Sequence, residues 1–292
     1  MRSFLFCVLC FSLTGAASAQ SYQVAPNPIR QGDTLHITGT GEALQARLSD
    51  RTIRLFQQKD GASWGLMPIP VLKEPGDYKL ELLGKDGVTL QSVDITVRDA
   101  HFATQNVVLS KAVTELKATP EDVDVMKAFR AEVLDTRYWD EPFGPPLPGC
   151  LTSPFGVQRK NNGKLTGDYH AGFDQRGKEG DPIRAIASGV VKVARPLQLQ
   201  GGTVAINHGQ GLQSIYMHMS KVEATEGSTV QKGDVIGYVG HTGRANGPHL
   251  HWSVYANGVP VNPGQWVPGF KSCYAAGAPK AGSKKRLKRT QH

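Results

Sequence analysis

From Ser21 to about Arg98, apolar and polar residues alternate in short runs. Successive side chains of a strand point to opposite faces, so a period of two indicates strands with one buried face. Turn signals such as Lys59-Asp60-Gly61 and Lys85-Asp86-Gly87 separate the runs. The pattern predicts a small immunoglobulin-like β-sandwich over residues 20–98. Its clearest alternations are Leu35-x-Ile37, Ile53-x-Leu55, Tyr78-x-Leu80-x-Leu82 and Val93-x-Ile95-x-Val97.

Residues 99–149 have a different pattern and are expected to form a connector. Thr119-Pro120-Glu121-Asp122 is a typical helix start, with a capping hydroxyl, proline in the first turn and acids at the positive end of the helix dipole. The helix is predicted over about residues 119–135. An apolar stripe near helical spacing is expected to pack on a neighbouring domain. The stripe consists of Val123, Met126, Phe129 and Val133.

From Leu151 onward the chain is rich in glycine and contains short strand-like runs but no long helical pattern. Glycines in such strands mark bulges, tight corners or places where another backbone comes close. The whole chain is therefore expected to be mainly β, with a single helix in the connector. The clearest runs are 190–193, 203–206, 214–216, 235–239 and 251–255.

Two histidines one residue apart open the last of these runs. His249 and His251 share one face if the segment is a strand, and Gly247-Pro248 supplies the turn before it. Two imidazoles side by side are weak evidence alone, because the pattern also occurs by chance. Its meaning depends on whether further ligands are present.

Further groups with suitable chemistry do occur upstream, at His170, Asp174 and His218. Neutral imidazole and carboxylate suit Zn²⁺, and a catalytic zinc site has three protein ligands and an open position. Histidines in addition to the three ligands suit hydrolysis, because the reaction also uses a general base, a general acid or an oxyanion stabiliser. The residues alone leave open which of His249 and His251 contacts the metal.

The ordered motifs between about Leu151 and Asn262 resemble the lysostaphin-type (LytM-like) zinc metalloendopeptidases of the bacterial cell wall. The motifs are His170-x-x-x-Asp174, Tyr216-x-His218, Val239-Gly240-His241-Thr242-Gly243 and Gly247-Pro248-His249-Leu250-His251. The resemblance implies a β-groove catalytic domain, placed here at residues 150–273, with one Zn²⁺ on its floor. It also implies the metal ligands His170, Asp174 and His251, with His218 and His249 as the catalytic pair.

Other polar residues are expected to have structural roles. His208 and His241 lie next to glycines and are expected to be structural or at the surface. His36 is expected to lie on the surface of a strand. Asn162, in Asn161-Asn162-Gly163, is expected in a turn, with a latency ligand of the metal as the alternative.

The first 19 residues are predicted to be a signal peptide, because Arg2 precedes an apolar run from Phe4 to Leu13 and Ala17-Ser18-Ala19 forms a cleavage site. The run is too short for a transmembrane helix, and no later stretch is long enough.

Removal of the signal peptide also removes Cys7 and Cys10 and leaves Cys150 and Cys273, which bracket the zinc motifs. A disulfide between them is predicted, with two unpaired thiols as the alternative.

The basic charge is concentrated at the C-terminus. The formal charge is +8, or +7 without Arg2, and six of these charges lie between Lys280 and Arg289, where there is no acid, so the rest carries about +1. A nearly neutral body argues against a nucleic-acid groove. Residues 274–292 are predicted to be a disordered tail, or an electrostatic contact to the anionic envelope surface.

The sequence and the resemblance together predict an exported zinc metalloendopeptidase that hydrolyses the peptide stems cross-linking bacterial peptidoglycan. The periplasm of a Gram-negative bacterium fits export with one disulfide best, and secretion is the alternative. Two other functions stay open. One is a non-catalytic wall-binding activator of another hydrolase, which the presence of all the implied ligands argues against. The other is a broader extracellular protease that cleaves glycine-rich proteins.

Overall fold

The computed structural model describes residues 21–107, 115–161 and 164–274 of the 292-residue chain. Most of the described residues with regular structure are in strands, which confirms the predicted mainly β fold. The predicted signal peptide and nearly all of the basic tail lie outside the described residues. Within them, no helix is long and apolar enough to cross a membrane.

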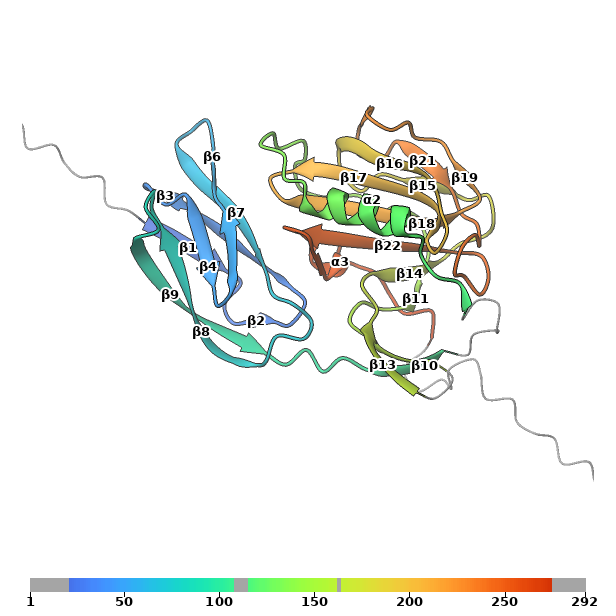
Figure 1. Cartoon of the computed structure of the whole chain (residues 1–292), viewed down its shortest axis with the longest axis horizontal. Coiled ribbons are helices and arrows are strands. Elements are labelled where there is room, and N and C mark those ends of the chain that lie inside the picture. Colours follow the sequence, from blue (N-terminus) through green and yellow to red (C-terminus); the bar gives the residue numbers. More distant parts are fainter. Residues whose placement is uncertain (1–20, 108–114, 162–163, 275–292) are drawn as a thin grey trace, which may run out of the picture.

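The N-terminal part is a sandwich of two sheets (Figure 1). The alternating residues predicted to be buried meet between the sheets, where Leu35, Ile37, Leu80, Leu82 and Ile95 are fully buried. One sheet has the order β1 (Ser21–Ala25), β3 (Thr34–Thr40), β7 (Ala62–Pro68) and β6 (Phe56–Gln57). The other has the order β2 (Ile29–Arg30), β9 (Thr89–Arg98), β8 (Gly76–Leu83), β4 (Gln45–Leu48) and β5 (Arg51–Arg54).

The C-terminal part is built on an eight-stranded sheet. Its order is β11 (Leu151–Ser153), β14 (Phe173–Arg176), β22 (His249–Ala256), β18 (Leu212–Met219), β17 (Gly201–Gly209), β16 (Gly189–Leu197) and β20 (Thr229–Val230), and β23 (Val259–Val261) pairs with β22. A three-stranded sheet of β15 (Pro182–Arg184), β21 (Val235–Tyr238) and β19 (Lys221–Val222) completes it. Strand β22, which carries His249 and His251, is thus central in the large sheet.

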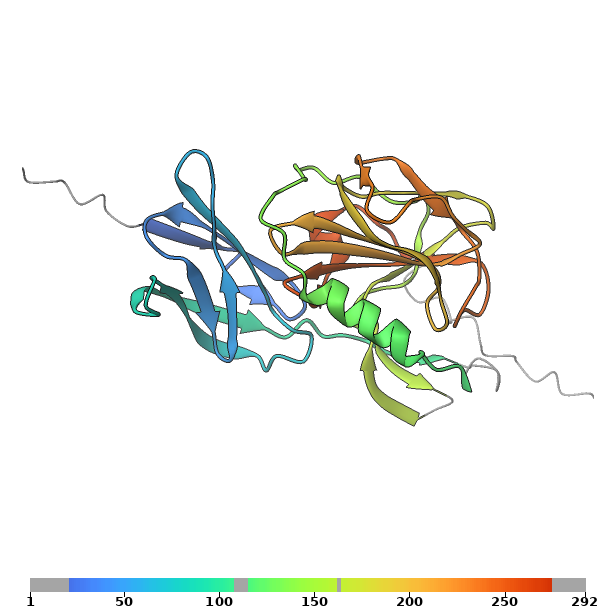
Figure 2. The same ribbon diagram turned by 45° about the horizontal axis from the view of Figure 1, so that its top comes forward.

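The two faces of the large sheet are covered differently. Leu250, Trp252 and Val254 of β22 point into the main apolar core and are fully buried. The alternate face packs on helix α2 (Pro120–Ala131) of the connector, which lies across the sheet in both ribbon views (Figures 1 and 2). Because β22 pairs with β18 without a register shift, His249 and His251 belong to the same face as Tyr255, which contacts α2.

Helix α2 begins as predicted but ends earlier. The Thr119 hydroxyl accepts a hydrogen bond from the Asp122 amide at 3.0 Å. The helix ends at Ala131, because the side-chain amides of Asn207 and Gln213 donate to carbonyls at its C-terminal end and the chain turns away there. The predicted stripe is therefore wrong at its ends: Met126 and Phe129 are buried, whereas Val123 and Val133 are exposed.

The connector also contributes a strand to the C-terminal part. Strand β10 (Thr104–Val107) runs parallel to β12 (Gln158–Asn161), which pairs with β13 (Lys164–Tyr169). This three-stranded sheet leads directly into His170. The connector is therefore part of the framework around the histidines, and β10 braces the hairpin that precedes one of them.

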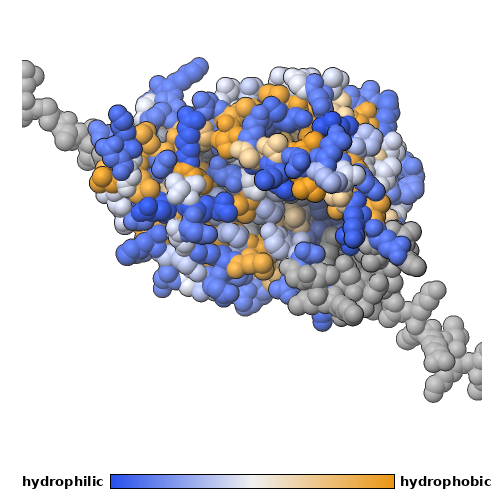
Figure 3. Space-filling view, viewed as in Figure 1, coloured by the Kyte–Doolittle hydropathy of each residue, from blue (hydrophilic) through white to orange (hydrophobic). Residues whose placement is uncertain are grey.

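An aromatic cluster joins the two parts. It contains Trp64 of β7, Trp139 and Phe143 of the connector, and Trp266 of helix α3 (Pro263–Trp266). His36 stacks on Trp266, with ring centroids 5.2 Å apart, so the prediction that it lies on the surface is wrong. The outer face of β3 is covered by α3, which the pattern within β3 does not reveal. On the face shown in Figure 3, hydrophobic and hydrophilic residues are interspersed.

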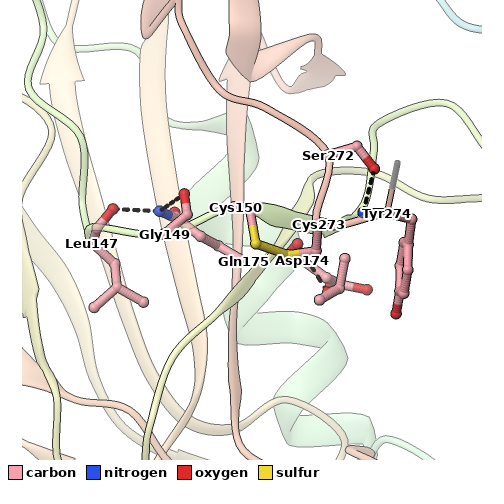
Figure 4. The surroundings of a disulfide bond; sticks show 9 residues. Leu147, Gly149, Cys150, Asp174, Gln175, Ser272, Cys273 and Tyr274 are labelled. Carbon is pink, nitrogen blue, oxygen red and sulfur yellow. Dashed lines mark hydrogen bonds between the residues drawn. A yellow bond between two sulfur atoms is a disulfide. The ribbon is translucent and has the colours of Figure 1, made fainter. Parts of the chain in front are cut away.

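The predicted disulfide is present between Cys150 and Cys273, whose Cα atoms are 4.9 Å apart. Figure 4 shows Gln175 beside it, with its side-chain amide donating to the carbonyls of Leu147 and Gly149. Cys150 also accepts a backbone hydrogen bond from Arg176 at 3.0 Å. The disulfide therefore supports strand β14, on which Asp174 lies.

We expect the double substitution Cys150→Ser with Cys273→Ser to lower the free energy of unfolding. The bond closes a loop with a sequence separation of 123 residues, which in the chain-entropy model corresponds to about 4–5 kcal/mol. Denaturant unfolding of the oxidised protein and of the double variant measures the difference. An unchanged unfolding midpoint would show that the bond adds nothing to the stability of this part.

Candidate metal centre

Three donor atoms converge at the junction of β14 and β22. Asp174 lies directly opposite His251 in the antiparallel pair, and His170 lies three residues before β14. The Asp174 Oδ1 atom is 2.8 Å from His251 Nδ1 and 3.0 Å from His170 Nε2. The two imidazole nitrogens are 3.0 Å apart. The pairing of two strands and the turn before β14 thus bring together residues that are far apart in sequence.

The hydrogen bonds at the far side of each ring determine which nitrogen carries a proton. His170 Nδ1 is 2.8 Å from the carbonyl oxygen of Pro154. A carbonyl only accepts, so Nδ1 donates to it and Nε2 is the ring nitrogen that faces the cluster. In His251, Nε2 is 3.0 Å from the Ser253 hydroxyl, and Nδ1 faces the cluster. Both rings are therefore oriented as metal ligands require.

The cluster fits a zinc ion. Two imidazoles and one carboxylate are a known ligand set for catalytic zinc, and bonds of roughly 2.0–2.2 Å would separate the donor atoms by roughly 3.3 Å. Burial opposes ionisation of Asp174, but His170 and His251 hold the pKa of its carboxyl well below the usual value. The carboxylate is thus anionic at neutral pH. Because the side chains of Asp174 and His251 are 18% and 11% exposed, solvent reaches one side of the cluster.

His218 reaches this site through an irregular backbone. The last regular pair of β18 with β22 is Met217 with His251. Strict alternation would then place His218 on the opposite face, with Trp252. Its φ of 63°, which is uncommon for a residue other than glycine, breaks the alternation, and its ring lies 5.0 Å from that of His249 between centroids. The backbone thus turns His218 toward the metal face.

His218 is neutral and has an available lone pair. Burial, followed by the neighbouring His251 and His249, lowers the pKa of His218 to about 3. Its Nδ1 is 2.9 Å from the carbonyl oxygen of Thr242, so Nδ1 carries the proton and Nε2 is an acceptor. This is the protonation state that a general base needs.

His249 lies beside the donor cluster and outside it. Its Nδ1 is 2.8 Å from the carbonyl oxygen of Gly247, so Nδ1 donates to that carbonyl. Its Nε2 is 3.8 Å from Asp174 Oδ1, whereas His251 Nδ1 is 2.8 Å from the same oxygen. The geometry therefore separates the two histidines that the sequence alone left equivalent.

The remaining histidines agree with their expected structural roles. His208 is fully buried and bonded to the Ser188 carbonyl and the Ser214 hydroxyl, and His241 is exposed next to Glu179. Asn162 lies outside the described residues.

The sequence did not predict the groups that orient the histidines of the site. Pro154, Gly247 and Thr242 act through backbone carbonyls, and Ser253 acts through its hydroxyl. A backbone carbonyl has no sequence signal.

Comparison with known proteins agrees with this site. Residues 168–263 match the sequence model of peptidase family M23. The DD-carboxypeptidase/endopeptidase Mpg of Neisseria meningitidis is 42% identical over 113 residues, which are 39% of this chain and 26% of that protein. The peptidoglycan DD-endopeptidase ShyA of Vibrio cholerae is 39% identical over 93 residues, which are 32% of this chain and 22% of that protein. The chain thus matches only about a quarter of the length of these curated relatives.

A solved structure extends the likeness over most of the chain. The crystal structure of a protein assigned to peptidase M23 from Pseudomonas aeruginosa is 26% identical, with a TM-score of 0.62. The match covers 84% of this chain and 96% of that one. All the histidines of the site and Asp174 lie within the segment that matches the family. The likeness to peptidase family M23 in sequence therefore lies in residues 168–263, which contain the whole candidate metal centre.

Proposed function

We propose that the protein is an exported zinc metalloendopeptidase that hydrolyses the peptide cross-links of bacterial peptidoglycan. The observation that carries the proposal is the convergence of His170, Asp174 and His251 within about 3 Å of one another, next to the adjacent rings of His218 and His249. The curated relatives named above, one of them a peptidoglycan DD-endopeptidase, support this substrate.

In this proposal, His170 Nε2, Asp174 Oδ1 and His251 Nδ1 hold the zinc ion. When bound, zinc supplies Lewis-acid chemistry, lowering the pKa of a water and polarising the scissile carbonyl. The carbonyl of Pro154 and the hydroxyl of Ser253 keep the two imidazoles in their tautomers and orientations.

His218 and His249 move the protons of the reaction. Each ring donates a hydrogen bond from Nδ1 to a backbone carbonyl, which leaves Nε2 as the nitrogen for proton transfer. One ring accepts the proton of the attacking water, and the other stabilises the developing oxyanion or protonates the leaving amine. Because both rings are fixed by backbone groups, they are oriented before substrate binds.

The proposed location is the cell envelope, and more specifically the periplasm of a Gram-negative bacterium. The apolar segment between Phe4 and Leu13 is typical of a signal peptide, and the disulfide between Cys150 and Cys273 suits an oxidising compartment. The basic residues between Lys280 and Arg289 are proposed to contact anionic envelope surfaces.

The proposal is tested by digesting purified peptidoglycan sacculi with residues 20–292 and reading the products by mass spectrometry. We expect cross-linked dimers to disappear, the reaction to stop with chelator, and activity to return with Zn²⁺ but not with Mg²⁺. A zinc-loaded protein that leaves the sacculi intact would contradict the proposal. Cleavage of a glycine-rich protein by the same preparation would then favour the broader protease.

A further inference from the structure

His218 lies where the pairing of β18 with β22 has ended. Its φ of 63° takes it out of the strand alternation, so the strand by itself does not fix the direction of the ring. The ring is held instead by the hydrogen bond from its Nδ1 to the Thr242 carbonyl, at 2.9 Å. Thr242 lies in the loop after β21, outside any regular element. A carbonyl in a loop holds a ring only as firmly as the loop itself is held.

The side chain of Thr242 ties this loop to two strands. Its hydroxyl accepts a hydrogen bond from the Gly202 amide at 2.9 Å and donates one to the Met219 carbonyl at 2.7 Å. Gly202 of β17 and Met219 of β18 are partners in the large sheet. A threonine hydroxyl has one proton and two lone pairs, so it makes both bonds at once. The hydroxyl thus joins the start of β17 and the end of β18 to the loop.

These bonds form a closed ring of contacts around His218. Met219, whose carbonyl accepts from the Thr242 hydroxyl, follows His218 directly in the chain. The Thr242 carbonyl then accepts from His218 Nδ1. The neighbouring turn packs tightly against the same loop, because a Cβ atom at Gly201 would clash with the carbonyl and the hydroxyl of Thr242. Thr242 therefore contacts both the ring of His218 and the backbone next to it.

We propose that Thr242 is a positioning residue for His218, and that its hydroxyl fixes the place of the carbonyl that holds the ring. The inference rests on the proposed role of His218 in proton transfer. A displacement of about 1 Å in a reacting group can lower the rate by about a hundredfold. Both partners of the hydroxyl are backbone groups outside the donor cluster, so its loss is expected to change proton transfer and not zinc binding.

The test measures kcat and KM for cleavage of a soluble cross-linked peptide dimer, with zinc affinity determined on the same samples. Thr242→Val keeps the shape of the side chain and removes the hydroxyl. We expect kcat to fall by about tenfold or more, because the Arg244 amide still bonds to the Leu199 carbonyl and keeps the loop in place while the Thr242 carbonyl shifts. KM and zinc affinity should stay unchanged. Thr242→Ser returns the hydroxyl without the methyl group and should recover most of the lost rate.

Ser220→Ala is the matched control. Ser220 is exposed, as Thr242 is, and its hydroxyl donates to the Val239 carbonyl at 2.9 Å, just before the same loop. The variant removes a bond of the same type from the same strand end and leaves the residue that holds the His218 ring intact. We expect it to have the kcat of the unmodified protein. Thermal unfolding shows that the compared samples are folded, and Thr242→Ala replaces Thr242→Val if the latter does not fold.

A kcat in folded Thr242→Val equal to that of the unmodified protein would overturn the inference. The inference is also wrong if Ser220→Ala loses as much activity, if Thr242→Ser recovers none of it, or if Thr242→Val binds zinc more weakly. The proposed function fails separately. That function is wrong if the unmodified protein binds no zinc or leaves sacculi intact, whereas the inference alone is wrong if that protein cleaves and Thr242→Val cleaves equally fast.

Discussion

Replacing His218 with alanine is expected to lower the rate of peptidoglycan hydrolysis by about two to four orders of magnitude while zinc stays bound. A positioned general acid or base contributes a factor of this size. His218 contributes none of the three converging donor atoms, and its Nδ1 is held by the Thr242 carbonyl. In the proposed mechanism its loss removes a proton-transfer group and leaves the three proposed metal ligands in place. His249→Ala is expected to have an effect of the same order.

The measurement is the initial rate of dimer cleavage, with zinc content determined on the same samples. His241→Ala is the matched control, because His241 is an exposed histidine of the nearby glycine-rich loop and contacts Glu179. It should retain normal activity. Full activity in His218→Ala would remove His218 from the mechanism, and loss of zinc in that variant would move it into the ligand set.

Replacing Asp174 with asparagine is expected to weaken zinc binding by more than about a hundredfold and to abolish hydrolysis at limiting zinc. The substitution keeps the size of the side chain and removes the anionic oxygen that lies within 3.0 Å of the nitrogens of His170 and His251. The effect of losing a direct ligand should exceed the 10–100-fold effect of losing an outer hydrogen-bond partner of a ligand.

Zinc affinity by chelator competition measures this effect, and cleavage should return in part at high zinc concentration. Asp234→Asn is a suitable control, since Asp234 is an exposed acid whose carboxylate accepts from the Gln231 amide in a turn. It should bind zinc normally. Unchanged affinity in Asp174→Asn would exclude Asp174 as a ligand.

The sequence was informative wherever structure depends on neighbouring residues. The period of two between Ser21 and Arg98 predicted strands whose apolar sides now form the core of the sandwich. Thr119 and Pro120 predicted the start of α2, because capping needs only the first turn. The spacing of His249 and His251 placed both imidazoles on one face of a strand, which is where the structure has them.

Local pattern failed where a distant element decides burial. His36 was expected at the surface, and it is covered by Trp266, which is far away in the chain. Val123 and Val133 have helical spacing with Met126 and Phe129, but the sheet under α2 contacts only the middle of the stripe. The periodicity of a segment shows which residues lie on the same face of a helix or strand. It does not show how much of that face another element will bury.

By itself, the sequence determined the mainly β class and pointed to the residues of the proposed site, since strand alternation and ligand type are properties of short segments. Only the tertiary structure decided which histidines contribute donor atoms to the cluster and which lie beside it. Pairing of β14 with β22 brings His251 to Asp174, and the positive φ of His218 turns its ring to the same face. Contacts between strands and helices far apart in the chain set these positions, and no local pattern contains them.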